Sequence, residues 1–193
     1  MMSGVAFASL QWKAAPMPGS SEPVQLATLP RAADGAFRAF VRFPAGWSRP
    51  GAGHYAVAEE LLILEGDLRV NELGWREGGY AWIPGRRVRS GTRSESGCLA
   101  FNWFAGPPRW IPGEPAEPAP ATDRSLAHWR DAPEGRLHDG PEHVTRISEH
   151  AQGKLLALSY AHREVLDLRD WTWCLDLAPG SRGITGPAFL RGW

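Results

Sequence analysis

The sequence lacks a charge excess and long apolar runs, and each absence excludes a class of partner. Its 21 basic residues balance 21 acidic ones, and no run rich in lysine and arginine occurs along its 193 residues. Nucleic-acid-binding domains usually carry a basic excess or a basic stripe, so we expect no nucleic-acid partner. No apolar run approaches the roughly 20 residues that a membrane-spanning helix requires, so we expect no membrane partner either.

Lysine and cysteine are also scarce. Lys13 and Lys154 are the only lysines, so arginine, whose planar guanidinium suits paired contacts, carries nearly all the positive charge. The two cysteines, Cys98 and Cys174, are too few for a disulfide framework, and both lie in apolar runs that predict inert core thiols. The first residues, up to Pro16, lack the pattern of a secretory signal. These features predict a cytoplasmic protein.

Glycine, proline and tryptophan are abundant, with 22, 17 and 10 residues. Glycines and prolines separate short runs of aromatic and branched residues, such as 60–65, 80–83 and 98–104. Runs of this length, without a long segment of helical periodicity, predict an all-β antiparallel sandwich or barrel. The tryptophans predict a thick core, a ligand pocket or an aromatic interface.

The runs are unevenly distributed and divide the chain into four parts. Residues 1–23 are predicted to form an N-terminal arm, and residues 24–107 hold the regular strand pattern of the barrel. Residues 108–124 are rich in proline and predict a semi-rigid connector. Residues 125–193 form a C-terminal extension that we expect to add strands.

One stretch has a fixed spacing of chemically informative residues. Gly46 is followed after five residues by Ala52, and then come His54, Glu59 and Gly66. This spacing resembles the first motif of the cupin superfamily, which runs Gly, five residues, His, one residue, His, three or four residues, Glu, six residues, Gly. Ala52 stands where the family has its first histidine.

The second cupin motif is matched at its start and then departs from the family pattern. Gly78 and Pro84 have the family spacing, but Arg86, Arg89 and Arg93 stand where the family has Gly, His and Asn. The resemblance implies a cupin double-stranded β-helix barrel, which is jelly-roll-like and often dimeric, so we expect a homodimer. A faint echo of 41–49 in 175–182 suggests that the extension is a truncated second cupin half.

The resemblance also leaves the metal question open. Cupins that bind metal hold it with the two His and the Glu of the first motif and the His of the second, so only His54 and Glu59 remain here. Transition-metal sites usually need three protein ligands. A third would have to come from elsewhere, and His138, His143 and His150 match no compact metal motif. We therefore expect no metal, with Arg89 beside Glu59 in its place; the alternative is a divalent Zn, Fe, Mn or Ni ion.

Two functions follow from these alternatives. The first is binding or sensing of a small, anionic molecule in the barrel, because an arginine in an aromatic-walled pocket suits a carboxylate. The second is a metal-dependent cupin enzyme of the dioxygenase or isomerase type, with His54 and Glu59 as partial ligands. The expected pocket residues are Arg89, His54, Glu59, Tyr55, Trp82 and Trp103.

Overall fold

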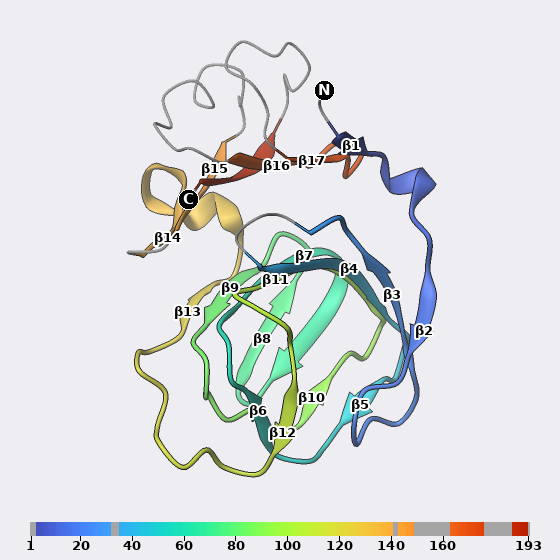
Figure 1. Ribbon diagram of the computed structural model, residues 1–193, viewed down its shortest axis with the longest axis vertical. Helices are drawn as coiled ribbons and strands as arrows, with labels where there is room; N and C mark the ends of the chain where they lie inside the picture. The colour runs from blue at the N-terminus through green and yellow to red at the C-terminus, as the bar shows by residue number, and fades with distance from the viewer. Residues whose placement is uncertain (1–2, 32–34, 141–142, 149–162, 176–186, 193) are drawn as a thin grey trace. The chain divides into compact units, whose positions relative to one another are not determined.

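The structure is a computed structural model that describes residues 3–31, 35–140, 143–148, 163–175 and 187–192. The chain forms two compact units (Figure 1). Residues 11–130 form the barrel unit, and residues 1–10 and 131–193 form the second unit. Within the described residues, no helix is long and apolar enough to cross a membrane.

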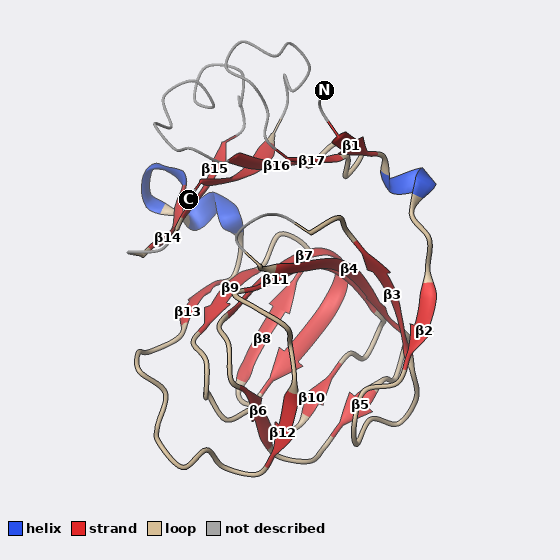
Figure 2. Ribbon diagram, viewed as in Figure 1, coloured by secondary structure: helices blue, strands red, loops and turns tan. Residues whose placement is uncertain are grey.

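The barrel unit is built from antiparallel strands (Figure 2). Its main sheet has the order β13-β9-β7-β11-β4-β3-β2, with β8 and β10 paired to β7, β5 paired to β10, and β12 paired to β6. The strands are β2 (Lys13–Ala15), β3 (Val24–Thr28), β4 (Phe37–Phe43), β5 (Ser48–Arg49), β6 (Gly53–Tyr55), β7 (Glu59–Val70), β8 (Leu73–Arg76), β9 (Tyr80–Ile83), β10 (Thr92–Arg93), β11 (Cys98–Phe104), β12 (Trp110–Pro112) and β13 (Arg124–Leu126).

The long strand β7 connects two groups of strands. Its residues 59–66 pair with β11, whereas residues 67–70 pair with β8. Gly66 lies at the transition with φ 75°, and a Cβ atom there would lie 1.8 Å from the carbonyl oxygen of Gly97. Only glycine tolerates both this backbone conformation and this close approach, which explains the glycine that ends the motif.

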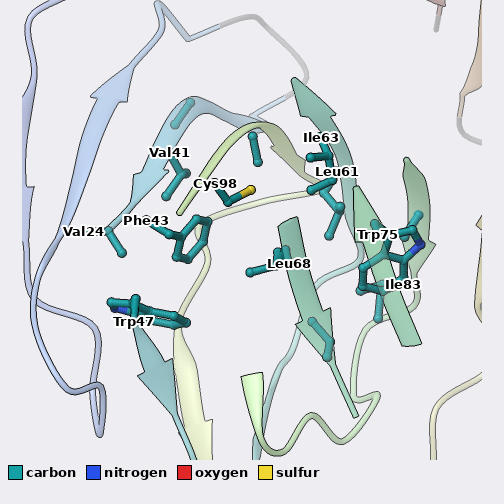
Figure 3. Packing of buried hydrophobic residues seen from close by; sticks show 14 residues of the cluster. Val24, Val41, Phe43, Trp47, Leu61, Ile63, Leu68, Trp75, Ile83 and Cys98 are labelled. Atoms are coloured by element: carbon teal, nitrogen blue, oxygen red, sulfur yellow. The ribbon is translucent and has the colours of Figure 1, made fainter. Parts of the chain in front are cut away.

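Alternate residues of the strands form the barrel core. Leu61 and Ile63 of β7 share a buried cluster with Ala81 and Ile83 of β9, and Figure 3 shows inward-pointing side chains around this interior. The register therefore turns Tyr80 and Trp82 to the opposite face of β9. Cys98 belongs to the same cluster, and burial raises the pKa of its thiol, as expected for an inert core cysteine.

The second unit contains strands of the C-terminal extension and one strand from the first residues of the chain. Its six-stranded antiparallel sheet has the order β1-β17-β16-β18-β15-β14. Glu164 is buried there and accepts hydrogen bonds from Arg191 Nη1 at 2.9 Å and Trp173 Nε1 at 2.6 Å, which compensate its burial. The strands are β1 (Ser3–Val5), β14 (Arg136–Asp139), β15 (Val144–Ser148), β16 (Arg163–Asp167), β17 (Trp173–Leu175) and β18 (Ala188–Gly192).

Short 3-10 turns complete the described secondary structure. They are η1 (Phe7–Ser9), η2 (Trp129–Asp131) and η3 (Pro133–Gly135). The predicted echo of the barrel motif at 175–182 falls, beyond Leu175, outside the described residues.

Candidate functional site: the barrel cavity

The barrel unit contains a cavity of about 350 Å³. Every lining residue belongs to this unit, and residues 15–18 of the arm and 108–110 of the connector form part of its wall. The apolar lining residues are Ala15, Pro16, Met17, Pro18, Leu26, Phe37, Val41, Phe43, Trp47, Leu61, Leu68, Val70, Phe104, Pro108 and Trp110. The polar ones are Arg49, Tyr55, Glu59, Arg89, Thr92, Asn102 and Arg109.

Glu59 is the only carboxylate among these lining residues, and both of its oxygens are engaged. Arg89 donates from Nη1 to Oε2 in a buried ion pair, and Asn102 donates from Nδ2 to Oε1. Glu59 and Arg89 are each only 4% exposed. A buried carboxylate requires such partners, because leaving it unpaired costs several kcal/mol.

The backbone holds Arg89 opposite the strand that carries Tyr55. Arg89 and Gly53 exchange two backbone hydrogen bonds, of 2.8 Å and 3.0 Å. Strand alternation then places Tyr55, two residues after Gly53, on the same side as the Arg89 side chain. The Arg89 guanidinium carbon lies 4.8 Å from the Tyr55 ring centroid. The structure thus brings Arg89, Glu59 and Tyr55 together, three of the residues expected in the pocket.

Arg49, which sequence reasoning did not single out, also lines the cavity. It is 4% exposed, its guanidinium carbon lies 3.6 Å from the Trp110 ring centroid, and its Nη1 donates to the Tyr55 hydroxyl at 3.3 Å. No carboxylate of the described residues pairs with it. The sequence offered only a weak signal, an arginine three residues after the Gly46 turn.

Four polar atoms of the lining are buried without a hydrogen-bond partner in the described part of the chain. They are Arg49 Nε, Arg89 Nε, Thr92 Oγ1 and Asn102 Oδ1. Buried polar groups are normally satisfied, so several orphaned atoms around one cavity favour a polar ligand there.

His54 does not line the cavity, unlike the placement expected from the motif. Its Nδ1 lies 3.1 Å from the carbonyl oxygen of Gly113, on the connector side. The physical reason is strand alternation in β6, which turns Tyr55 toward the cavity and the preceding residue, His54, away from it. Three residues separate Tyr55 from Glu59. The first cupin motif allows three or four residues between its second histidine and its glutamate, so Tyr55 also has the spacing of that histidine.

Trp82 and Trp103 do not line the cavity either. In the strand register, Trp82 and Trp103 both pair with Glu60 of β7, whereas the neighbouring residue Glu59 faces the cavity. The two tryptophans therefore share the face of Glu60, opposite to the cavity, because side chains alternate along each strand.

The donor set around the cavity does not fit a cupin-type metal. The described residues contain no cluster of three His, Cys, Asp or Glu side chains that could hold a metal ion. Glu59 is bound by Arg89 and Asn102, and a second cation would be repelled by the Arg89 guanidinium. His138 and His143 stack on each other in the second unit, with ring centroids 4.6 Å apart, and His150 lies outside the described residues.

Comparisons with known proteins show similarity in structure only. No family model and no curated protein sequence matches the chain. A candidate dioxygenase from Nostoc punctiforme PCC 73102 aligns over 98% of this chain and 81% of its own, with a TM-score of 0.69 and 14% identity. Protein Ylba from E. coli aligns over 99% and 86%, with a TM-score of 0.60 and 12% identity. A candidate acetylacetone dioxygenase from Methylibium petroleiphilum PM1 aligns over 63% and 87%, with a TM-score of 0.50 and 19% identity. Such identities establish a shared fold and carry no activity with it.

Proposed function

We propose that this chain, which has the cupin fold, uses its barrel cavity as a metal-free receptor for a small organic anion, with a carboxylate as the charged group. The fold is the all-β cupin barrel that the Gly46–Gly66 spacing predicted, and its structural neighbours share it. The observation that carries the proposed function is the buried Arg49 guanidinium, which lines the cavity without a carboxylate partner in the described residues.

The charges of the lining support an anionic ligand. Two buried arginines, Arg49 and Arg89, share the lining with one carboxylate, Glu59, which leaves one buried positive charge in excess, and the exposed Arg109 adds a further positive charge to the wall. A buried charge is costly unless it is paired and hydrogen-bonded. A carboxylate would supply that pairing, because its two oxygens match the planar fork of a guanidinium. Arg49 is therefore the proposed ligand-binding cation, and Arg89 mainly neutralises Glu59.

Tyr55 and Trp110 support the same assignment by orienting Arg49. The Trp110 ring stacks under the guanidinium, and the Tyr55 hydroxyl accepts one of its hydrogens. Stacking fixes the plane of the guanidinium and leaves its edge free for in-plane hydrogen bonds. The Nε atom without a partner lies on that edge, where it can donate to a carboxylate oxygen.

The alternative function is a metal-dependent enzyme. It is suggested by two structural neighbours that are named as candidate dioxygenases. It requires ligands beyond Glu59 that the described part of the cavity wall does not supply. Elemental analysis of the purified protein separates the two functions. We expect less than stoichiometric metal, whereas one tightly bound transition metal per chain would overturn the metal-free receptor.

Titration calorimetry with small carboxylates tests the receptor directly. We expect binding that Arg49→Met weakens at least tenfold, because the cation that pairs with the ligand is removed. Arg69→Met is the matched control, since Arg69 is an exposed arginine of the same barrel that does not line the cavity. Carboxylate binding that is equally tight in the Arg49 variant would contradict the proposed function.

The expected homodimer and the cytoplasmic location stay predictions. Light scattering of the purified protein measures the mass in solution, and a mass of about twice 21.2 kDa is the expected result. Among the described residues, Ile111 is the only large apolar side chain that is exposed, so a dimer contact formed by these residues is expected to be largely polar.

A further inference from the structure

We infer that the ligand is a hydroxylated carboxylic acid with an apolar body, held by Arg49 at its carboxylate and by the Asn102 side-chain oxygen at its hydroxyl. This inference rests on the proposed function and specifies the class of anion. It comes from two features of the cavity: the separation of its polar and apolar walls, and the chemistry of the Asn102 amide.

Five of the seven polar lining residues form one connected group around Tyr55. Arg49 reaches the Tyr55 hydroxyl, Arg89 lies over the Tyr55 ring, and Glu59 joins Arg89 to Asn102. The ligand's charged and polar groups are therefore expected at this end of the cavity. A carboxylate placed elsewhere would face apolar walls and would lose its hydration without compensation.

Most of the remaining wall is apolar. Val41 and Phe43 lie on β4, Leu68 and Val70 on the second half of β7, and Leu26 on β3. Figure 3 shows Phe43, Leu61 and Leu68 pointing toward the same interior. At about 350 Å³, the cavity has room for an aromatic or branched body, because ligand pockets begin at roughly 300 Å³. A small dicarboxylate would cover none of this wall and would place a second charge against it.

The Asn102 amide has a fixed orientation. An ionised carboxylate only accepts hydrogen bonds, so the amide nitrogen of Asn102 must face Glu59. The amide oxygen then faces away from Glu59, and it is buried without a partner in the described residues. This oxygen only accepts hydrogen bonds, and therefore it requires a donor on the ligand.

A hydroxyl group is the donor that the local charges favour. The other common donor on a small acid is an ammonium group, which would add a positive charge beside Arg49 and Arg89. The lining already carries three arginines against one carboxylate, so an ammonium would be repelled. A neutral hydroxyl satisfies the Asn102 oxygen without this penalty, and Thr92 offers a further hydroxyl nearby in the lining.

Calorimetry with four probes tests the inference: phenylacetate, its two hydroxylated forms mandelate and 4-hydroxyphenylacetate, and malonate. We expect at least one hydroxylated acid to bind about tenfold more tightly than phenylacetate, as for one added hydrogen bond to a buried acceptor. We expect malonate to bind more weakly than phenylacetate. Phenylglycine, a fifth probe that carries an ammonium where mandelate carries its hydroxyl, is expected to bind more weakly than phenylacetate as well.

Two variants locate the hydroxyl contact. Asn102→Leu is expected to abolish the preference for the hydroxylated acid, whereas Thr92→Val, a change in the same lining, is expected to keep it. Circular dichroism confirms that each variant is folded. A hydroxyl preference that survives in Asn102→Leu and disappears in Thr92→Val would overturn the assignment to Asn102.

The outcomes separate the inference from the proposed function. If phenylacetate binds as tightly as both hydroxylated acids, or malonate binds most tightly, the ligand class is wrong, while Arg49-dependent anion binding still stands. If the protein binds none of the four carboxylates, the receptor function fails for this class, and the inference fails with it.

Discussion

The ring of Trp110 occupies the space that a side chain at Gly53 would need. A Cβ atom on Gly53 would lie 2.3 Å from Cζ2 of Trp110, far below any normal contact distance. Tyr55 and Trp110 both line the cavity, and strand alternation places Gly53 on the same side of β6 as Tyr55, so the Trp110 ring of the neighbouring β12 takes the place of a side chain at Gly53.

This relationship predicts that even a methyl group at position 53 is destabilising. Gly53→Ala is expected to lower the free energy of unfolding by about 1–3 kcal/mol, the usual cost of overpacking a core. Urea denaturation measures the change. In a Trp110→Leu background the same substitution is expected to cost less, because the smaller side chain makes room. Equal costs in the two backgrounds would show that the two residues are not coupled.

The two buried arginines of the cavity are expected to differ in their effect on stability. Arg89→Met leaves the Glu59 carboxylate buried without its cation, which costs about 3–5 kcal/mol. Arg49→Met leaves no carboxylate of the described residues unpaired, so its free energy of unfolding is expected to stay within about 1 kcal/mol of the wild type. Denaturant unfolding of both variants without ligand tests this contrast, and a reversed order would contradict the assigned roles.

Two substitutions in the cavity are expected to create a metal-binding ligand set around Glu59. The double variant Tyr55→His and Arg89→His would place two imidazoles beside Glu59, the ligand set of a facial triad. We expect it to gain zinc or nickel binding in calorimetry, and Arg89→His alone to gain none.

His54 provides the control for that experiment. Because His54 faces Gly113 and not the cavity, adding His54→Ala to the double variant is expected to leave the gained metal affinity unchanged. Loss of the metal on removal of His54 would show that His54, and not position 55, points at Glu59.

Asp67 gives the barrel a pH-dependent contribution to stability. Burial raises the pKa of Asp67, but hydrogen bonds from the Ser96 side chain and from the backbone N–H groups of Glu95 and Ser96 outweigh it, so the pKa lies below its ordinary value of 3.8. The stabilisation is complete at pH values above the unfolded-state pKa and is lost as the pH falls through the lower pKa of the folded state.

Asp67→Asn is therefore expected to reduce the free energy of unfolding at pH 7 by about 1 kcal/mol, a modest value because the carboxylate is partly exposed. The difference from the wild type should shrink as the pH is lowered through the folded-state pKa of Asp67. Unfolding measured from pH 7 to pH 2 checks this, and a difference that grows toward low pH would have the wrong sign.

The fold could be predicted because its signals are local. Glycines with fixed spacing, such as Gly46 and Gly66, mark positions of positive φ, which glycine adopts most readily, and the short aromatic runs near them indicate strands. Glu59 lies at the start of the strand that the motif marks, so its place near the cavity also followed from spacing.

The rest of the site depends on pairing between distant segments. Arg49 meets the Trp110 ring only because the connector returns to pair with β6, and Asn102 meets Glu59 only because β11 pairs with β7 in one register. His54 and Trp82 were expected in the cavity because sequence does not show which face of a strand points inward. A shift of one residue reverses that choice.

The pairing of β1 with β17 has a consequence for synthesis on the ribosome. Ser3–Val5 are translated well before their partners, Trp173–Leu175, because the whole barrel unit lies between them in the sequence. All barrel strands have left the ribosome once residue 130 has done so. The barrel unit can therefore fold before β17, the partner of β1, has been synthesised. The order of folding thus differs from the order of the chain: β1 precedes the barrel strands, yet it joins a unit that can be completed only after them.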